Sequence, residues 1–375
     1  MSGKPLPSIS VIIPLYNKRA HIGRCLASIR AQTFTDYEII IVDDGSTDDG
    51  AEIARGFLRD SDRLIQQENE GAAAARNRGI AVMRGQLAAF LDADDEWLPS
   101  HLTSLMELER RFPQAGLFST GIALHGLGGF AICCSIDSRE PQLVPDYFTA
   151  CLNEPDPVNS SSCAIRREVF EVLGGQALGA HRGEDLELFA RVCLRWPLAL
   201  HPDISTIIHL IAQNRSEKVH KHIAGFPITV ETLVEYLRNG DVPPPLTDSV
   251  RRYLRYCIMA SLRNAMLSRD VECTREGLSS SLIAEFGLTR QAQWLQLKMR
   301  LFPLPLILMV HRLHSLRWFI KSYRLSYGMR TSMHWVGTSP SEAQWAALAW
   351  QRMQRHSASD TVLRGNYPIP EQVER

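Results

Sequence analysis

Three aspartates, Asp92, Asp94 and Asp95, lie within four residues of one another at the end of an apolar run, Leu87 to Leu91. Carboxylates at positions i and i+2 of an extended segment point the same way. They offer hard oxygen ligands of the kind that bind Mg2+ or Mn2+ in proteins. A divalent ion held there could bind a diphosphate. The pattern therefore indicates metal and phosphate chemistry at residues 92–95.

The same acids also have a purely structural interpretation. Asp is common where a strand turns into a helix, because its side chain accepts hydrogen bonds from backbone NH groups. We expect such a helix over Glu96 to Glu109. Three acids within four residues exceed what one helix cap needs, but this stretch alone leaves both interpretations open.

The element that positions these acids is expected to be one of several parallel strands. Four short apolar runs alternate with segments whose apolar residues recur at helical spacing. The predicted strands are Ser8–Pro14, Glu38–Val42, Arg63–Gln67 and Leu87–Leu91, and the predicted helices lie around Ile22 to Ile29, Ala51 to Leu58 and Ala72 to Arg84. This alternation predicts a doubly wound α/β sheet. Ligands bind such sheets at the carboxyl ends of the strands, where Tyr16, Asp44 and Asp92 are expected to meet.

The middle of the chain is expected to contain strands and loops up to residue 158, and then more regular elements. Ser160–Ile165 resembles a strand and Arg167–Leu173 a helix. Glu184 and Asp185 open a further helix that has an apolar face. The interpretation that these two acids only favour the helix dipole stays open.

The C-terminal part changes in character to helices and then to a basic segment. Helices are predicted over Ile228–Leu237, Ser249–Leu267 and Arg275–Phe286. No acidic residue lies between Glu285 and Glu342, whereas cationic residues are frequent there: Arg290, Lys298, Arg300, Arg312, Arg317, Lys321, Arg324 and Arg330. With the apolar run 301–310, this segment suits the surface of an anionic membrane, but it is too short and too rich in proline to cross one. A basic helix packed on the chain's own acidic domain is the competing interpretation.

Composition and the number and spacing of cysteines indicate the cellular compartment and the kinds of binding partner. The 375 residues include 45% hydrophobic ones, 41 Lys and Arg, and 41 Asp and Glu, so the bulk charge indicates no nucleic-acid partner. The eight cysteines lack CxxC spacing, and reduced thiols are expected. Residues 1–7 lack the apolar core of a secretion signal. We therefore expect a cytoplasmic protein, with peripheral binding to the inner face of the cell membrane.

Four motifs in order resemble the nucleotide-sugar-binding half of the family 2 glycosyltransferases. They are Val11-Ile-Ile-Pro-Leu-Tyr-Asn-Lys18, Ile41-Val-Asp-Asp-Gly-Ser-Thr-Asp48, Gly71 with Ala75-Arg76-Asn77-Arg78-Gly79, and Phe90-Leu-Asp-Ala-Asp-Asp-Glu-Trp97. This resemblance covers about residues 8–100. A weaker one continues through Gly183-Glu184-Asp185-Leu186 to about residue 220. It implies a GT-A fold, which is a Rossmann-like, mostly parallel sheet flanked by helices, with a C-terminal helical extension.

The resemblance also implies roles for individual residues. Pro14, Tyr16, Asn17 and Asp44 would surround the base and ribose of the nucleotide, with Asp44 accepting a hydrogen bond from uracil. Arg76 would reach the ribose or diphosphate, although a surface ion pair with Glu68 or Glu70 is the alternative. The remaining roles belong to acidic residues. Asp92, Asp94 and Asp95 would bind the metal, and one of them, such as Asp92, would also contact the ribose. Asp185 would be the general base, with Glu184 as the second choice.

These roles predict an inverting, metal-dependent enzyme that transfers one sugar from a nucleotide sugar, most simply a UDP-sugar, to a glycan or lipid-linked acceptor in cell-envelope polysaccharide synthesis. Leu194-Arg195-Trp196 lacks the Gln of the polymerase motif Gln-x-x-Arg-Trp, so single transfer is expected. A nucleotidyltransferase and a non-catalytic nucleotide-sugar-binding regulator are the alternatives. The predicted division is residues 1–222 for the GT-A domain, 223–288 for a helical accessory region, 289–335 for the basic segment, and 336–375 for a helix and tail.

Overall fold

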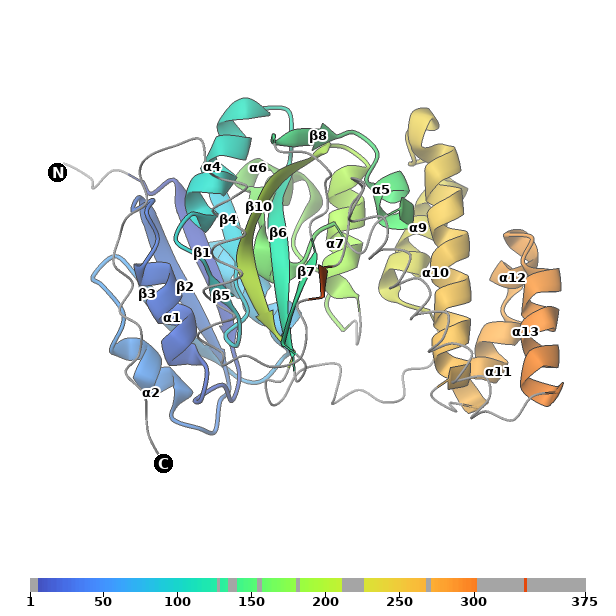
Figure 1. Cartoon of the computed structure of the whole chain (residues 1–375), viewed down its shortest axis with the longest axis horizontal. Helices are drawn as coiled ribbons and strands as arrows, with labels where there is room; N and C mark the ends of the chain where they lie inside the picture. Colours follow the sequence, from blue (N-terminus) through green and yellow to red (C-terminus); the bar gives the residue numbers. More distant parts are fainter. Residues whose placement is uncertain are drawn as a thin grey trace.

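The computed structural model describes residues 6–126, 129–133, 140–153, 157–179, 183–210, 226–267, 271–301 and 334–335. A central sheet with helices on both faces forms the N-terminal part, and a group of helices lies beside it (Figure 1). The predicted tail helix and most of the basic segment lie outside the described residues. Within the described part, no helix combines the length and the apolar character needed to cross a membrane.

The strands form one mixed sheet. In chain order they are β1 (Ile9–Leu15), β2 (Tyr37–Asp44), β3 (Arg63–Gln67), β4 (Leu87–Phe90), β5 (Glu96–Trp97), β6 (Leu117–Gly126), β7 (Gly129–Cys133), β8 (Gln142–Val144), β9 (Cys163–Arg166), β10 (Leu198–His209) and β11 (His334–Trp335). The order along the main path is β11-β7-β6-β9-β4-β1-β2-β3. Strands β1 to β4 are parallel, as predicted, whereas β9 runs antiparallel to β4 and β6.

The helices cover both faces of this sheet and continue beyond it. They are α1 (Ile22–Arg30), α2 (Gly50–Arg55), α3 (Ala72–Val82), α4 (His101–Arg111), α5 (Tyr147–Asn153), α6 (Arg167–Leu173), α7 (Glu184–Cys193), α9 (Ile228–Asn239), α10 (Thr247–Leu267), α11 (Val271–Ser279), α12 (Ser281–Glu285) and α13 (Thr289–Leu301). Two short 3-10 turns, η1 (Ser160–Ser162) and η2 (Pro244–Leu246), complete the described structure.

Strand β1 shows why this sheet is buried on both faces. Its successive side chains point to opposite sides. Ile9, Val11 and Ile13 belong to the core that includes α1 and α4, whereas Ile12 packs in the core on the side of α3. Helix α3 approaches β1 closely at Gly79, where a Cβ atom would lie 2.5 Å from Cγ2 of Ile12. The sequence of β1, mostly apolar and rich in β-branched residues, is therefore the sequence of a central strand.

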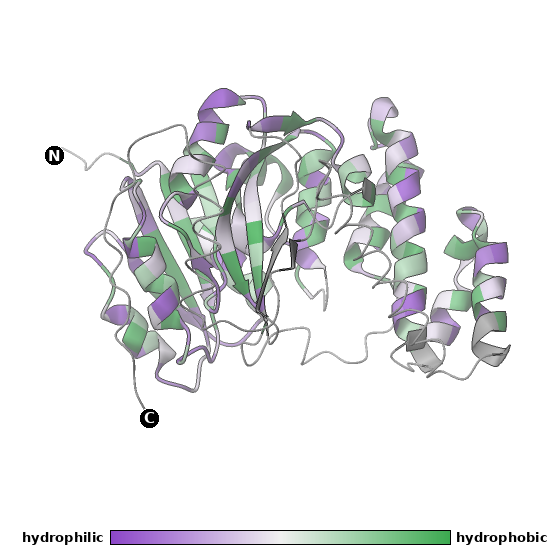
Figure 2. Cartoon of the chain, viewed as in Figure 1, coloured by the Kyte–Doolittle hydropathy of each residue, from purple (hydrophilic) through white to green (hydrophobic). Residues whose placement is uncertain are grey.

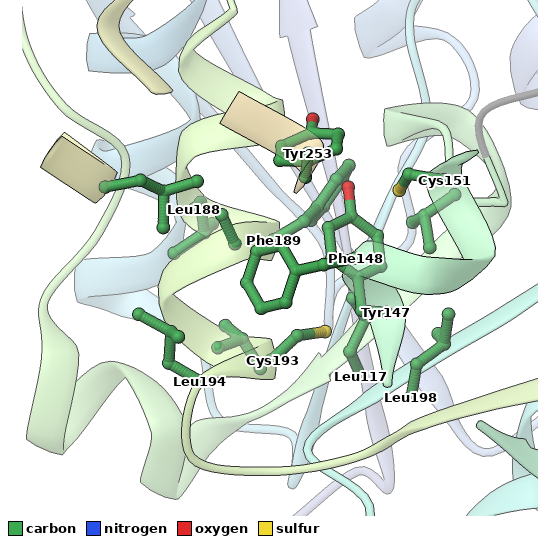
Figure 3. Packing of buried hydrophobic residues seen from close by; sticks show 14 of the residues in the cluster. Leu117, Tyr147, Phe148, Cys151, Leu188, Phe189, Cys193, Leu194, Leu198 and Tyr253 are labelled. Atoms are coloured by element: carbon green, nitrogen blue, oxygen red, sulfur yellow. The ribbon is translucent and has the colours of Figure 1, made fainter. Parts of the chain in front are cut away.

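The helical region after residue 226 shares its core with the α/β part. Tyr253 of α10 lies 5.7 Å from Phe148 of α5, measured between ring centroids. Figure 3 shows these two rings beside Phe189 of α7, and buried residues of α9 such as Leu233 belong to the same cluster. Green, hydrophobic residues are interspersed along α9 and α10 with purple ones (Figure 2). Burial of the apolar side chains against α5 and α7 fixes the position of these helices.

Three predicted elements differ from the structure. The helix predicted from Glu96 begins only at His101, because residues 96 and 97 pair with β10 and the Trp97 ring is buried. The helix predicted over Arg275–Phe286 is two helices, separated at Ser280, whose side chain caps α12. The strand predicted from Ser160 begins with the turn η1 and becomes extended only at Cys163.

A buried carboxylate, Glu38, fastens β2 to its neighbours. Its oxygens accept hydrogen bonds from Ser10 Oγ at 2.7 Å, Arg84 Nε at 2.7 Å and Arg63 Nη2 at 3.1 Å. Burial opposes ionisation, but the hydrogen bonds from Arg84 and Ser10 outweigh it and hold the pKa of Glu38 below its ordinary value of 4.5. The carboxylate therefore stabilises the fold as an anion.

We expect Glu38→Gln to lower the free energy of unfolding by about 1.5–3 kcal/mol at pH 7, the range for hydrogen bonds to a charged group. Because the folded-state pKa is depressed, the contribution is complete above pH 4.5 and is lost as the pH falls through the folded-state value. Urea unfolding of both proteins between pH 3 and 8 measures this. The difference between them should shrink in acid, and a difference that stays constant with pH would contradict the assignment.

Candidate active site

The ends of β1 and β2 are joined by Asn17, which has a positive φ of 51°. Its Oδ1 accepts a hydrogen bond from the Thr47 backbone NH at 2.8 Å, and its own NH donates to Ser46 Oγ at 3.1 Å. Asn tolerates this left-handed conformation better than most residues. The connection fixes the loop that carries Tyr16, whose side chain remains 43% exposed, and Pro14 precedes it in the partly buried end of β1.

Asp44, at the end of β2, is buried and holds the loop before α3. Its Oδ1 accepts from the Glu70 backbone NH and from Gln67 Nε2, both at 2.9 Å, and its Oδ2 accepts from the Gly71 NH at 2.8 Å. A carboxylate can accept about four hydrogen bonds. The structural role of Asp44 is therefore to hold the loop before α3. Its contact with a nucleotide base stays a prediction.

Arg76 lies inside the site and does not form the alternative surface ion pair. It is 5% exposed, and its Nη2 lies 2.6 Å from Asp92 Oδ1. Burial alone would lower the pKa of Arg76, but the charges of Asp92, Asp185 and Glu184 raise it. These acids therefore lie within electrostatic reach of one buried guanidinium group.

An amide clamp secures the chain segment that leads toward α7. Asn77 Nδ2 donates to the Gln176 carbonyl oxygen, and Asn77 Oδ1 accepts from the Gln176 NH, both at 2.8 Å. Gln176 Oε1 also accepts a hydrogen bond from Arg76 Nη1 at 3.3 Å. A Cβ atom at Gly175 would overlap the Asn77 amide, which explains the glycine at that position. The clamp joins elements that are about a hundred residues apart.

The three aspartates after β4 have different surroundings. Asp92 has a side chain that is 36% exposed, and its Oδ2 receives no hydrogen bond from the part of the chain that the structure describes. Asp94 Oδ2 lies 2.7 Å from the ammonium Nζ of Lys18. The backbone oxygen of Asp94 accepts from Arg24 Nη2 at 2.7 Å. Neither acid caps α4, which begins at His101.

Asp95 is directed into the protein. Its Oδ2 accepts a hydrogen bond from Ser161 Oγ at 2.6 Å, and its Oδ1 accepts from the His209 backbone NH at 3.0 Å. Burial, with the charges of Asp92 and Asp94 adding to it, raises the pKa of Asp95 to about 7. The contact between Asp95 and a metal stays a prediction, because both of its carboxylate oxygens accept hydrogen bonds inside the protein.

The carboxylate oxygens of Asp92 and Asp94 are suitable ligands for a hard divalent ion, but in this structure each carboxylate forms an ion pair with a basic side chain. Among the described residues, no three His, Cys, Asp or Glu side chains are grouped as a metal site would require. Asp92 and Asp94 are instead each paired with a basic side chain, Arg76 and Lys18. Carboxylate oxygens are the ligands that Mg2+ and Mn2+ prefer. Binding of such an ion through Oδ2 of Asp94 would require its ion pair with Lys18 to open.

Asp185 is brought to these acids by the turn η1. Its Oδ2 accepts a hydrogen bond from Ser160 Oγ at 3.0 Å, while the next residue, Ser161, binds Asp95. Helix α7 begins at Glu184, after Gly183 in the left-handed conformation (φ 81°). Burial, the charge of Asp185 and the charge of Asp92 raise the pKa of Glu184. The predicted base and the predicted metal acids therefore belong to one hydrogen-bonded site.

Sequence reasoning missed the residues that connect the site. Ser160 and Ser161 were expected in a plain strand, and Lys18, the last residue of the first motif, had no predicted role. His209, which had no assigned role, contributes its NH to Asp95 and its Nε2 to Glu96 at 3.1 Å. The run Asn159-Ser-Ser-Ser162, in which Asn159 caps the turn, was a local signal that could have indicated η1.

The first third of the chain is similar in sequence to a known family. Residues 10–122 match the family described as Glycosyl transferase family 2. An uncharacterized glycosyltransferase of Escherichia coli, YibD, is 48% identical over 102 residues, which cover 27% of this chain and 30% of YibD. The aligned segment thus spans less than half of that relative.

Solved glycosyltransferase structures share the fold at low sequence identity. S. aureus TarS, residues 1–349, in complex with UDP-GlcNAc, aligns with a TM-score of 0.60 and 17% identity over 74% of this chain and 80% of that chain. The mannosyltransferase PcManGT from Pyrobaculum calidifontis, in complex with GDP-Man and Mn2+, aligns with a TM-score of 0.52 and 17% identity over 94% of this chain and 88% of that chain. The fold is therefore the GT-A fold that the sequence motifs predict.

Proposed function

We propose that this chain, which has the GT-A fold, is a family 2 glycosyltransferase that transfers one sugar from a nucleotide sugar to an acceptor hydroxyl with inversion at the anomeric carbon. The observation that carries this proposal is the position of Asp185. The turn η1 joins it, through Ser160 and Ser161, to the acids that follow β4. A candidate base beside a candidate diphosphate site is the arrangement that sugar transfer requires.

The donor is proposed to be a UDP-sugar. Its base would lie by the exposed ring of Tyr16, between the loops that Asn17 joins, with Pro14 and Asp44 as further contacts. The related structures hold UDP-GlcNAc in TarS and GDP-Man in PcManGT, which supports a nucleotide sugar as the donor class. An acceptor such as the Asp44 carboxylate suits the imide NH of uracil.

Asp92 and Asp94 would hold Mn2+ or Mg2+, with Asp95 supporting them from inside. A bound divalent ion supplies Lewis-acid stabilisation of the negative charge that develops on the leaving diphosphate. Arg76 provides a second, fixed positive charge at Asp92. Because this guanidinium is buried and held by Gln176, it is oriented before the donor arrives.

Asp185 is proposed to remove the proton from the acceptor hydroxyl. Its Oδ2 is held by Ser160 Oγ, which fixes the side chain at the start of α7. One base on the acceptor side and direct displacement of the diphosphate produce inversion. Glu184, whose pKa is raised by burial, is the second candidate.

The acceptor is proposed to be a glycan or a lipid-linked sugar of the cell envelope, used at the cytoplasmic face of the membrane. The basic residues between Glu285 and Glu342 support attraction to an anionic lipid surface. Helix α13, which belongs to the described part of this segment, exposes Trp294 and Leu297, side chains that suit an interface. Packing of the basic segment on the chain's own acidic surface is the competing proposal.

The test is hydrolysis of a panel of UDP-, GDP- and dTDP-sugars by the purified protein, with added Mn2+ and with EDTA. We expect slow release of one nucleoside diphosphate that stops in EDTA and resumes with Mn2+. Release of pyrophosphate from a nucleoside triphosphate and a sugar phosphate would instead indicate a nucleotidyltransferase. Tight binding of one nucleotide sugar without turnover, also when candidate acceptors are added, would indicate a regulator.

A further inference from the structure

We propose that Lys18 is an internal counter-ion for Asp94, which it holds when no metal is bound and releases when a divalent ion and the donor bind. After the exchange, the ammonium group is available to the donor diphosphate. This inference rests on the metal and donor of the proposed function, and it assigns a role to Lys18, the last residue of the first motif, to which the resemblance gives none. Its basis is that Asp94 pairs with a lysine, whereas the neighbouring Asp92 pairs with a buried arginine.

The pair formed by Lys18 and Asp94 is close and shielded from solvent. Nζ and Oδ2 are 2.7 Å apart, and the two side chains are 12% and 8% exposed. An ion pair in such surroundings is weakened by solvent far less than a surface pair. Removing its cation would leave a carboxylate without its counter-ion beside Asp92 and Asp95.

The backbone that carries Lys18 is fixed, so only its side chain needs to move. The Lys18 carbonyl oxygen accepts from the His21 NH at 2.9 Å and from the Ile22 NH at 3.0 Å, at the start of α1. On the other side, Asn17 is held by the β2 loop. A lysine ammonium on a flexible four-carbon stem can change partners without backbone movement.

Arg76 cannot make the same exchange. Its guanidinium is held by Asp92 and by Gln176, and it is 5% exposed, so leaving Asp92 would strand a buried charge. Each aspartate is bound to its cation through one oxygen, but the Asp92 side chain is 36% exposed, so an ion can reach it without that exchange, whereas the Asp94 side chain is 8% exposed. Asp94 is thus the predicted ligand whose binding to a metal must displace a local cation.

This competition has a measurable sign. A divalent ion at Asp94 must displace the ammonium, so part of its binding free energy is spent on opening the ion pair. Replacing Lys18 with a neutral side chain removes the competitor and leaves the carboxylates more negative. Metal affinity should therefore rise, whereas the stability of the metal-free protein and the affinity for the diphosphate should fall. If Lys18 had a purely structural role, its replacement would lower the metal affinity, the stability of the metal-free protein and the affinity for the diphosphate together.

The experiment compares Lys18→Met with Arg19→Met in the full-length chain. Arg19 follows in the same loop, but its guanidinium pairs with exposed Asp49, so its loss is the matched control. We expect Lys18→Met to bind Mn2+ about tenfold more tightly, as read from the EPR signal of free Mn2+ without nucleotide. The metal-free melting temperature should fall, and its increase on adding Mn2+ should exceed that of the wild type. At saturating Mn2+, the affinity of Lys18→Met for UDP should fall severalfold. Arg19→Met should leave the Mn2+ affinity, the melting temperatures and the UDP affinity unchanged.

A second variant, Lys18→Arg, keeps the charge and predicts the opposite sign. A guanidinium group can pair with a carboxylate through two hydrogen bonds, so Mn2+ binding should weaken severalfold. Unchanged or weaker Mn2+ binding by Lys18→Met, if that variant folds, or unchanged binding by Lys18→Arg, would overturn the inference while leaving the proposed function intact. If the wild type binds no Mn2+ but hydrolyses a nucleotide sugar, the exchange is wrong and the transferase is not. If it does neither, both are wrong.

Discussion

Replacement of Asp185 by Asn is expected to lower the rate of sugar transfer by about a thousandfold, within the range for loss of a general base. Asparagine keeps the size of the side chain and can still accept the hydrogen bond from Ser160 Oγ, but it cannot take a proton. The protein should therefore fold and bind the donor normally. Single-turnover transfer to an acceptor, measured together with the affinity for UDP and Mn2+, separates loss of chemistry from loss of binding.

Glu184→Gln is the matched control for this prediction. Glu184 and Asp185 are adjacent in the first turn of α7, and both lie within electrostatic reach of Arg76. Only Asp185 is fixed by Ser160. We expect transfer by Glu184→Gln to stay within about tenfold of the wild type, since a nearby charge is lost but not the base. A large loss in Glu184→Gln with little effect of Asp185→Asn would reverse the two roles.

The strands and helices of the first hundred residues could be predicted because their signals are local. Strand β3 has the predicted bounds, and β1, β2 and β4 agree within two residues at each end; later in the chain, helix α6 also has the predicted bounds. The strands are short, mostly apolar runs, and in the helices apolar residues recur at helical spacing. The same signals correctly placed Asp44 and Asp92 at the carboxyl ends of their strands and Asp185 in the first turn of α7.

The errors arose where tertiary contacts decide the local structure. Residues after Asp95 read as a helix, but pairing with β10 makes Glu96 and Trp97 extended and buries the indole ring. The indole Nε1 then donates to the Ser161 carbonyl oxygen at 2.6 Å. No pattern of periodicity can reveal a partner more than sixty residues away, so the start of α4 could not be predicted.

The internal organisation of the site has the same origin. Arg76 could equally have paired with Glu68 or Glu70, which are close in sequence, and only the fold brings Gln176 to its guanidinium and buries it beside Asp92. Likewise, Asp92, Asp94 and Asp95 are chemically equivalent in the sequence. They differ in the structure because Lys18, Arg76 and the turn η1 approach them from different elements.

That difference leads to a contrast between Asp94→Asn and Asp95→Asn. Loss of the Asp94 charge should weaken Mn2+ binding and lower metal-dependent turnover by at least about a hundredfold, because a direct ligand contributes more than the outer contacts of a metal site. Asp95 should behave as such an outer contact. Its amide variant can still accept the hydrogen bond from the His209 NH and can donate to Ser161 Oγ, so the buried geometry can be kept.

We therefore expect Asp95→Asn to change Mn2+ affinity and turnover by about tenfold or less, at the low end of the effect of outer contacts. Mn2+ titration of both variants and of the wild type, followed by donor hydrolysis at saturating metal, measures the contrast. Thermal unfolding without metal shows that each variant is folded. Equal losses in the two variants would mean that Asp95 leaves its internal partners to bind the ion directly, and the assignment of the metal to Asp92 and Asp94 alone would then be wrong.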